Sequence, residues 1–389
     1  MRVFLNLLKR EFSLFWKNKV LVVLFLGAPM FYGILLGYVY SKGKVTDLPI
    51  VVVDQDNSAL SKKIIDMLKD NEVVSVAKIM PDKFYLSQSM IAENAACAII
   101  ISENFEQGVY SKKYPEVTTI VNTSNVLTAN YASSAINKVL STLKAGIAIE
   151  ALTKQGMPRT IAMQQYEPYK MTFIKKNNRG SNYMYFLWPG VLGTVLQQVL
   201  FLGLALSFSA EYENNTFGEL LEKSSSAFIL LSSKIFPYLL MSIGVWICYI
   251  IFAFWFRMPL HLNIFNLTLV TGLFVLSASC IGVLVSVILP TQLKATEVLM
   301  VIATPSFILS GFTWPLSQMP VFIQVIANLI PTTHYLHIVK VLIVENGTLS
   351  QVATSIYALL AIGMVCGILA YLILSKRIKK FKVAKSGIV

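Results

Sequence analysis

Long stretches without charged side chains constrain this chain more than any other feature of its sequence. Residues 20–40 contain no Asp, Glu, Lys or Arg, and comparable apolar runs begin near positions 183, 235, 264, 298 and 351. About 20 helical residues at roughly 1.5 Å each cover the hydrocarbon core of a bilayer, which is about 30 Å thick. With 55% apolar and 14% charged residues, the composition also differs from that of soluble proteins. The sequence therefore predicts an α-helical polytopic membrane protein.

Basic side chains gather at both ends of the chain. Residues 1–19 carry five Lys or Arg against one Glu, and residues 375–389 carry six Lys or Arg and no acid. Because Lys and Arg near membrane spans stay in the cytoplasm, both termini are predicted to be cytoplasmic. Much of the net charge of +13 lies in these tails, where anionic lipids explain it. Nucleic acid is therefore not an expected partner.

The longest uncharged run, residues 298–339, is long enough to cross a membrane twice. Two cytoplasmic termini require an even number of crossings, so with five other spans this run is expected to cross once, giving six transmembrane helices. Its four prolines each remove a backbone donor and interrupt a helix. The remainder of the run is therefore expected to form a re-entrant hairpin at the outer face.

This topology divides the chain into five parts. We expect a cytoplasmic amphipathic interface helix at 1–19, transmembrane helix 1 at 20–40, an inserted extracytoplasmic α/β domain at 41–182, transmembrane helices 2–6 at 183–374, and a basic cytoplasmic tail at 375–389. The fourth part includes a cytoplasmic coupling loop at 210–233 and the outer re-entrant hairpin at about 312–335.

Residues 41–182 alternate between strand and helix patterns. Strands are predicted at 48–53, 73–79, 95–101 and 117–121, and helices at 58–69, after Pro81, and at 126–154. The βαβ order predicts a small α/β domain with a mostly parallel sheet. The rest of the chain is expected to be in contact with the lipid bilayer.

Asp54 and Asp56 follow the first of these strands and raise the question of an active site. Their Asp-x-Asp spacing superficially resembles that of haloacid-dehalogenase-like phosphatases, but no adjacent Asp-Asp pair occurs in the chain. An EF-hand loop would need Gly at Ala59 and Glu at Ile65. Capping of the following helix by Asp56, Asn57 or Ser58 is the favoured interpretation, with a metal or ligand contact as the weaker alternative. No catalytic residue, cofactor or metal is expected.

The predicted spans are almost free of ionisable side chains, which ion-coupled transporters and pumps need. The sequence contains no Gly-rich phosphate loop ending in Lys-Ser or Lys-Thr. A chain of this kind that moves a cargo would need energy from elsewhere. Any ATPase is therefore expected to be a separate polypeptide, and the chain itself is not expected to be an enzyme.

Two segments on the predicted cytoplasmic side need an explanation. In residues 1–19, Phe4, Leu8, Phe12 and Phe15 share one helix face and the polar residues, Arg10 among them, lie largely opposite. In the loop 210–233, four glutamates outnumber the lysines: Glu211, Glu213, Glu219 and Glu222. A net acidic cytoplasmic loop is unusual, and a basic protein partner would account for it.

These segments, together with the broken run, resemble permease subunits of type-2 ABC exporters, in the branch with a large extracytoplasmic domain after the first span. The most specific stretches are "SGFTWPLSQMP" with "LIPTTHYL", and "EYENNTFGELL", which looks like that family's coupling segment. Asn214-Asn215 departs from the pair that the family often has there. The resemblance covers nearly the whole chain.

The resemblance implies a permease that forms the translocation path of an ATP-driven exporter in a prokaryotic inner membrane. It implies ABC ATPase subunits as partners, a second permease in a homodimer or related heterodimer, and room for a periplasmic adaptor. The residues implied in ATPase coupling are Glu211, Glu213, Thr216 and Glu219. A membrane-anchored receptor or secretion-accessory protein, with an extracytoplasmic binding domain and no transport activity, is the alternative function.

Two glutamines and several small residues within the spans predict further contacts, namely hydrogen bonds of the glutamines and close packing between helices. Gln197 and Gln198 lie in the second predicted span, and a polar amide at that depth should find a partner or water, so one of them is a candidate for the translocation path or the dimer interface. The small-residue spacings at 33–37 and 363–367 permit close helix packing, for which ordinary packing within the subunit is the favoured explanation. An apolar path suits amphiphilic drugs or lipids better than small ions.

Overall fold

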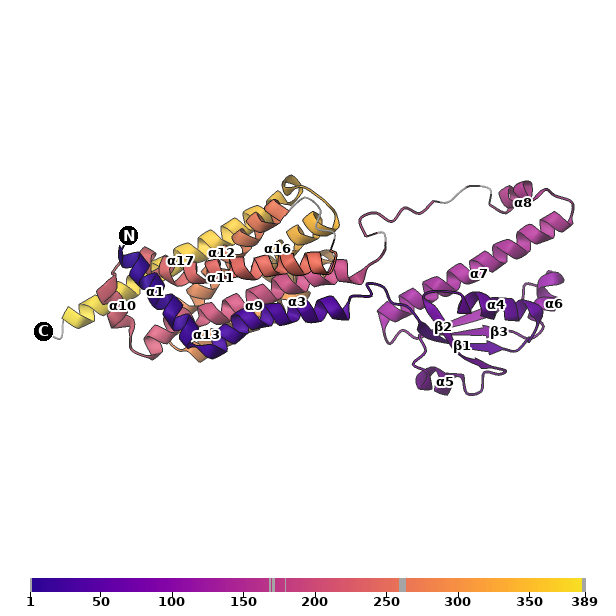
Figure 1. The fold of residues 1–389 in the computed structure, drawn as a ribbon, viewed down its shortest axis with the longest axis horizontal. Helices are drawn as coiled ribbons and strands as arrows, with labels where there is room; N and C mark the ends of the chain where they lie inside the picture. Colours follow the sequence, from indigo (N-terminus) through magenta and orange to yellow (C-terminus); the bar gives the residue numbers. More distant parts are fainter. Residues whose placement is uncertain (1, 168, 170–171, 179, 259–263, 387–389) are drawn as a thin grey trace. The chain divides into compact units, whose positions relative to one another are not determined.

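The computed structural model describes residues 2–167, 169, 172–178, 180–258 and 264–386. These residues form two compact units, one made of Met1–Gly43 with Lys175–Val389 and the other of Lys44–Ile174. The first, the helical unit, contains the long apolar helices, and the second, the sheet unit, contains the four described strands (Figure 1). Each unit has its own hydrophobic core.

Over the described residues, six helices of the helical unit are long and apolar enough to cross a membrane. Four of them are α9 (Tyr183–Glu213), α11 (Ala227–Trp255), α12 (Ile264–Ile288) and α17 (Ala353–Ser386). The first joins α2 (Lys19–Val22) to α3 (Ala28–Val39) through a π-helical turn, and the fifth joins α13 (Gln292–Ala303) to α14 (Ser306–Leu309). The prediction of six helices with the length and apolarity of membrane spans is confirmed.

Helix α9 is the central helix of this unit. It packs against α3, α11, α12 and α13, and its side chains Phe201 and Phe208 are fully buried. A Cβ added to Gly203 of α9 would lie 2.3 Å from the ring of Tyr238 in α11. The Tyr238 hydroxyl donates a hydrogen bond to the Gly203 carbonyl across 3.0 Å. Glycine therefore permits an approach of α9 and α11 that a side chain would block.

The small-residue spacings at residues 33–37 and 363–367 allow close helix packing within the chain. A Cβ on Gly33 or Gly37 of α3 would meet the rings of Phe252 and Phe256 at 2.8 Å and 2.1 Å. A Cβ added to Gly363 of α17 would lie 3.3 Å from the Cα of Ser277 in α12. The interpretation as ordinary packing within the subunit is confirmed.

The proline-rich run after α14 forms a series of short helices. A 3₁₀ turn (Leu316–Gln318) is followed by α15 (Val321–Asn328), α16 (Pro331–Val339) and a π-helical turn (Lys340–Val344). Pro315 and Pro320 immediately precede the first two, and Pro331 is the first residue of α16. Proline is tolerated at the start of a helix because the missing N–H has no intrahelical acceptor there. The run therefore contributes one long helix, and the depth of α15 and α16 in the membrane stays a prediction.

Helix α1 (Arg2–Lys17) packs against α11. It buries Leu7 and Phe15, and the Phe15 ring meets the rings of Phe25 and Tyr238 edge to face at 5.7 Å and 6.0 Å. Phe4, Leu8 and Phe12 are only half-buried. The amphipathic face predicted for this segment thus packs on the helical unit, and a position in the membrane interface stays a prediction.

The sheet unit contains a four-stranded sheet in the order β2-β1-β3-β4. Its strands are β1 (Leu48–Asp54), β2 (Val74–Met80), β3 (Cys97–Ile101) and β4 (Val117–Val121). Strand β1 is parallel to both β2 and β3, whereas β4 is antiparallel to β3. All four predicted strands and the mostly parallel sheet are confirmed.

Helices cover both faces of this sheet, because successive side chains of β1 point to opposite sides. Ile50 and Val52 pack with α4 (Ala59–Lys69) and α7 (Val126–Lys154), and Val51 and Val53 pack with α5 (Leu86–Ala92). Figure 1 shows α4 and α7 on the side of the sheet opposite to α5. The short helices α6 (Phe105–Tyr110) and α8 (Arg159–Tyr166) are additional to those predicted.

The two aspartates at the end of β1, Asp54 and Asp56, hydrogen-bond to the nearby backbone. Ser58 is the N-cap of α4 and forms a reciprocal capping box with Ser61, so the prediction of a helix cap in this stretch is confirmed. Asp54 accepts hydrogen bonds from the Asn57 N–H at 2.9 Å and from the Ser61 hydroxyl at 2.8 Å. Asp56 accepts one from the Glu106 N–H at 3.0 Å, at the start of α6. Both carboxylates are thus engaged in holding helix starts.

Candidate functional site

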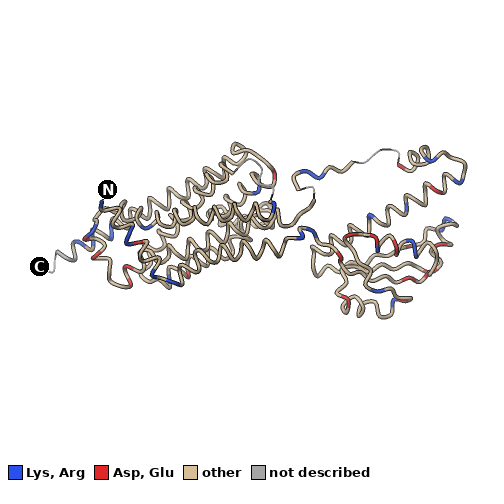
Figure 2. Tube along the Cα trace, viewed as in Figure 1, with Lys and Arg blue, Asp and Glu red and all other residues tan. Residues whose placement is uncertain are grey.

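Several helices meet at the end of the helical unit where the chain begins and ends. Figure 1 shows the start of α1 and the end of α17 at this end. The short helix α10 (Phe217–Lys223) joins them, since the ring of its Phe217 lies 5.6 Å from that of Phe381 in α17. Figure 2 shows charged residues near the ends of the helices and long uncharged stretches between them.

A compact cluster of charged side chains, the Glu211 cluster, ties α1 to α9 and α11. It consists of Arg10 and Glu11 from α1, Glu211 from α9 and Lys234 from α11. The Arg10 guanidinium donates to both oxygens of Glu211, at 2.6 Å and 2.8 Å. Lys234 Nζ lies 2.7 Å from Glu211 Oε1 and 3.0 Å from Glu11 Oε1. One carboxylate therefore joins α9 both to α11, which follows closely in the sequence, and to α1, which is far away in it.

Because the cluster is buried, its positive and negative charges must balance. The side chains of Glu211 and Lys234 are only 3% and 2% exposed, and a buried ion is stable only when it is paired and hydrogen-bonded. Two acids face two bases, and the Thr216 hydroxyl donates a further hydrogen bond to Glu211. The hydrogen bond to Glu211 raises the pKa of the Arg10 guanidinium, so Arg10 stays charged. The arrangement is a fixed joint between helices.

The structure separates the four residues implied in ATPase coupling into two groups. Glu211 is buried within the Glu211 cluster, and the half-buried Thr216 donates a hydrogen bond to it. Glu213 and Glu219 are exposed. Glu213 accepts a hydrogen bond from the Gln292 N–H at 2.9 Å, which helps to hold the start of α13, and Glu219 lies in the first turn of α10.

Sequence reasoning missed the partners of Glu211. Arg10 was expected on the polar face of α1, whereas it is half-buried and bonded to Glu211. A signal was present at Lys234, which stands alone near the start of an apolar helix. A buried lysine needs an acid, and Glu211 is an acid at the end of the preceding long helix. Spacing along the chain did not indicate Arg10, which is 201 residues away from Glu211.

Arg377 of the C-terminal helix α17 contacts α9 and α12 at the end of the helical unit where the chain begins and ends. The Arg377 guanidinium lies 4.5 Å from the centre of the Tyr212 ring and donates to the Ile288 carbonyl at 2.7 Å. Ile288 is the last residue of α12, where a cation favours the negative end of the helix dipole. Arg377 therefore fastens the end of α17 to α9 and α12.

The two glutamines of α9 lie in different surroundings. Gln197 is fully buried, accepts a hydrogen bond from the Thr332 hydroxyl in α16, and donates to the Ser306 hydroxyl in α14 at 3.4 Å. Gln198 is half-buried, and its side chain has no hydrogen-bond partner among the described residues. Gln197 thus joins α9 to α14 and α16 within one chain, while the assignment of either residue to a path or a dimer interface stays a prediction.

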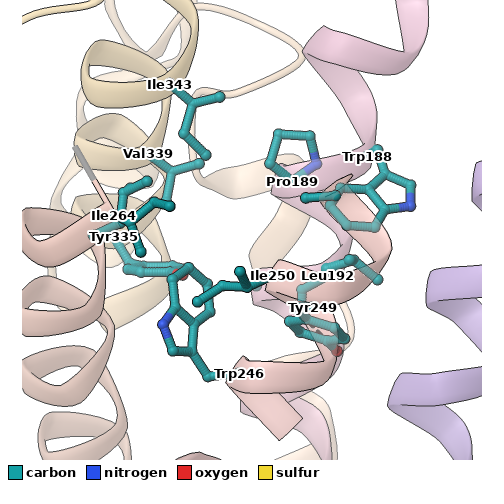
Figure 3. Close-up of a pocket in the computed structure, with 13 residues that line it drawn as sticks. Trp188, Pro189, Leu192, Trp246, Tyr249, Ile250, Ile264, Tyr335, Val339 and Ile343 are labelled. Carbon is teal, nitrogen blue, oxygen red and sulfur yellow. Dashed lines mark hydrogen bonds between the residues drawn. The ribbon is translucent and has the colours of Figure 1, made fainter. Parts of the chain in front are cut away.

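An apolar cavity lies between α9, α11, α12 and α16. Figure 3 shows Trp188, Tyr249 and Tyr335 among the side chains that face it, together with aliphatic residues. Its volume is about 30 Å³, which is far below the several hundred Å³ of typical ligand pockets. In this conformation the cavity is a packing gap between aromatic side chains.

Known proteins resemble this chain over most of its length. The family model described as ABC-2 family transporter protein matches residues 19–372. The probable multidrug ABC transporter permease YbhR of Escherichia coli (strain K12) is 21% identical over 344 residues, covering 86% of this chain and 88% of YbhR. The inner membrane transport permease YhhJ of the same strain is 22% identical over 336 residues, covering 84% and 86%. The probable multidrug ABC transporter permease YbhS is 27% identical over 153 residues, covering 39% and 41%.

Proposed function

The chain belongs to the ABC-2 family of transporter proteins and is a membrane-spanning transporter subunit, and from this premise we propose that it is the permease of an ATP-driven exporter. In this proposal, ATP is hydrolysed on separate ATPase subunits, and a second permease completes the translocation path. The sequence has no Gly-rich phosphate loop of its own, which supports a separate ATPase.

The Glu211 cluster is the observation that carries this proposal. A permease must transmit movement from an ATPase at one end to the helices that cross the membrane. The cluster joins α1 to the end of α9 and the start of α11 through buried ion pairs. Because α9 is the central helix of the unit, a displacement of α1 or α10 reaches the core through this joint. Glu213 and Glu219 stand exposed beside it and would meet a basic surface of the ATPase.

We further propose an orientation for the chain. The basic residues of both tails support cytoplasmic termini in a prokaryotic inner membrane, and six crossings then support an extracytoplasmic position for the sheet unit. On this orientation α10 faces the cytoplasm, and α15 and α16 form a re-entrant hairpin at the outer face.

Labelling of single cysteines in intact cells tests this orientation. In a variant without native cysteines, a cysteine replacing exposed Glu103 of the sheet unit is expected to react with a membrane-impermeant maleimide. A cysteine replacing exposed Lys376 of α17 is expected to react only after the cells are opened. The reverse pattern would reject the orientation.

The apolar membrane-spanning helices and the relatives both bear on the cargo. The helices that would line a path are apolar and almost free of fixed charge, and two of the relatives are described as probable multidrug permeases. We therefore propose amphiphilic, largely apolar molecules as cargo. An adaptor outside the membrane is compatible with an extracytoplasmic sheet unit.

Reconstitution tests the proposed function directly. The chain, expressed with its cognate ABC ATPase, is expected to co-purify with it as a stable complex, and ATP hydrolysis in proteoliposomes is expected to rise when a transported amphiphile is added. Small inorganic ions serve as control additives and should not stimulate hydrolysis. A folded chain that binds no ATPase would contradict the proposal and favour a receptor without transport activity.

A further inference from the structure

A second and much larger cavity lies in the proline-rich run of the helical unit. Its volume is about 450 Å³, and its walls come from the segment after α14, from α16 and from the start of the last long helix. This volume falls in the range of ordinary ligand pockets. It is lined by polar side chains as well as apolar ones, in contrast to the aromatic cavity of Figure 3.

Three basic side chains line this cavity from one continuous helical stretch. His334 and His337 belong to α16, and Lys340 begins the π-helical turn that continues it. Steps of three residues place all three on one helix face. None of the described residues that line it is an acid, although Glu345 approaches Lys340 with its carboxylate 3.8 Å from Nζ. This long contact between two exposed side chains neutralises Lys340 only weakly.

Hydrogen-bonding groups surround these side chains. His334 Nε2 donates to the Asn328 carbonyl at 2.9 Å, which leaves its Nδ1 without a partner among the described residues. His337 Nδ1 lies 2.9 Å from the Ser355 hydroxyl, which leaves its Nε2 similarly available. Thr333 is another wall residue that is only 2% exposed, and its hydroxyl has no partner in the described part of the chain. The Thr333 hydroxyl oxygen is itself buried, so the ring nitrogens of His334 and His337 and the Lys340 ammonium are the donors that this wall offers to a ligand.

We propose that this cavity binds a phosphate group that carries a net negative charge, presented either by a lipid head group or by a soluble molecule. Lys340 supplies a fixed positive charge, and the two histidines supply directional donors for phosphate oxygens. The buried side chains Phe312 and Leu336 add an apolar wall, against which the carbon chain next to the phosphate would pack. This binding requires no ATPase and holds independently of the proposed transport function.

Titration of the purified full chain in an uncharged detergent and phosphate-free buffer tests the proposal. Dihexanoyl phosphatidylglycerol, dihexanoyl phosphatidylcholine and inorganic phosphate are added separately, and binding is followed by the thermal unfolding midpoint and by native mass spectrometry. Phosphatidylglycerol is expected to bind more tightly than zwitterionic phosphatidylcholine. Saturable binding of phosphatidylglycerol alone assigns the site to a lipid head group, and saturable binding of inorganic phosphate shows that a soluble phosphate suffices. Binding of neither, or equal binding of both lipids, overturns the proposal.

Substitutions place the binding in this cavity. Lys340→Gln is expected to weaken phosphatidylglycerol binding about tenfold, because it removes a charge-assisted contact, and Lys340→Arg should retain most of the affinity. The matched control Lys376→Gln removes one exposed positive charge on α17 away from the cavity and should bind like the unaltered chain. The pair His334→Gln with His337→Gln gives a second variant should Lys340→Gln fold poorly. Unchanged affinity in folded Lys340→Gln, or in the folded histidine pair, overturns the assignment.

Discussion

Glu211→Gln is expected to lower the free energy of unfolding of the helical unit by about 3–5 kcal/mol, the usual effect of removing one partner of a buried ion pair. The substitution leaves Arg10 and Lys234 with only Glu11 as a counter-charge. Because Lys234 is 2% exposed, water cannot replace the lost carboxylate. The measurement is thermal or denaturant unfolding of the purified chain in detergent, with the yield of folded protein as a second readout.

A double substitution separates charge balance from shape. Lys234→Met added to Glu211→Gln removes one acid and one base, so Arg10 and Glu11 stay paired, and part of the lost stability should return. The matched control is Glu150→Gln on α7, which breaks an exposed pair with Lys154 at 2.8 Å and should leave the unfolding midpoint unchanged. An unaltered midpoint in Glu211→Gln would show that the cluster is not a structural joint.

Glu213→Lys combined with Glu219→Lys is expected to leave the chain folded and inserted but to abolish cargo-stimulated ATP hydrolysis. Both side chains are exposed beside the Glu211 cluster, so their reversal disturbs an external partner more than the fold. Loss of a charged pair at a protein interface weakens binding by about 2–5 kcal/mol when the pair is buried in the complex, which is more than tenfold in affinity. Co-purification of the ATPase and its stimulated hydrolysis rate are the two measurements.

Two controls distinguish coupling from other effects of charge. Glu213→Gln keeps an oxygen that accepts from the Gln292 N–H, and therefore isolates the role of the charge from that of the hydrogen bond at the start of α13. Glu72→Lys with Glu103→Lys makes the same change of charge at exposed positions of the sheet unit and should leave hydrolysis normal. Full retention of ATPase binding and stimulation in the Glu213 and Glu219 double variant would reject the coupling role. Helix-end electrostatics at α10 and α13 would then remain as the function of these acids.

The sequence by itself determined the features that depend on neighbours along the chain. Uncharged runs of about 20 residues identify membrane-spanning helices because an apolar helix of that length matches the bilayer core. Prolines such as Pro320 and Pro331 place the breaks in the long run, since each removes a backbone donor. The strands of the sheet unit and the cap at Ser58 follow from alternation and from local hydrogen bonding. The short helices α6 and α8 were not predicted, because a helix of one or two turns shows too little hydrophobic periodicity in the sequence.

Only the tertiary structure decided which polar groups share a site. The sequence places Glu211 in a loop, whereas it lies in the last turn of α9 and is buried against Arg10 of α1, 201 residues away. The sequence did not indicate the partners of Gln197, which are Thr332 and Ser306 of the same chain. The cavity of about 450 Å³ likewise forms where α16 meets the segment after α14 and the start of the last helix. The physical reason is that pairing and desolvation depend on distances between helices, and no local pattern in a sequence encodes those distances.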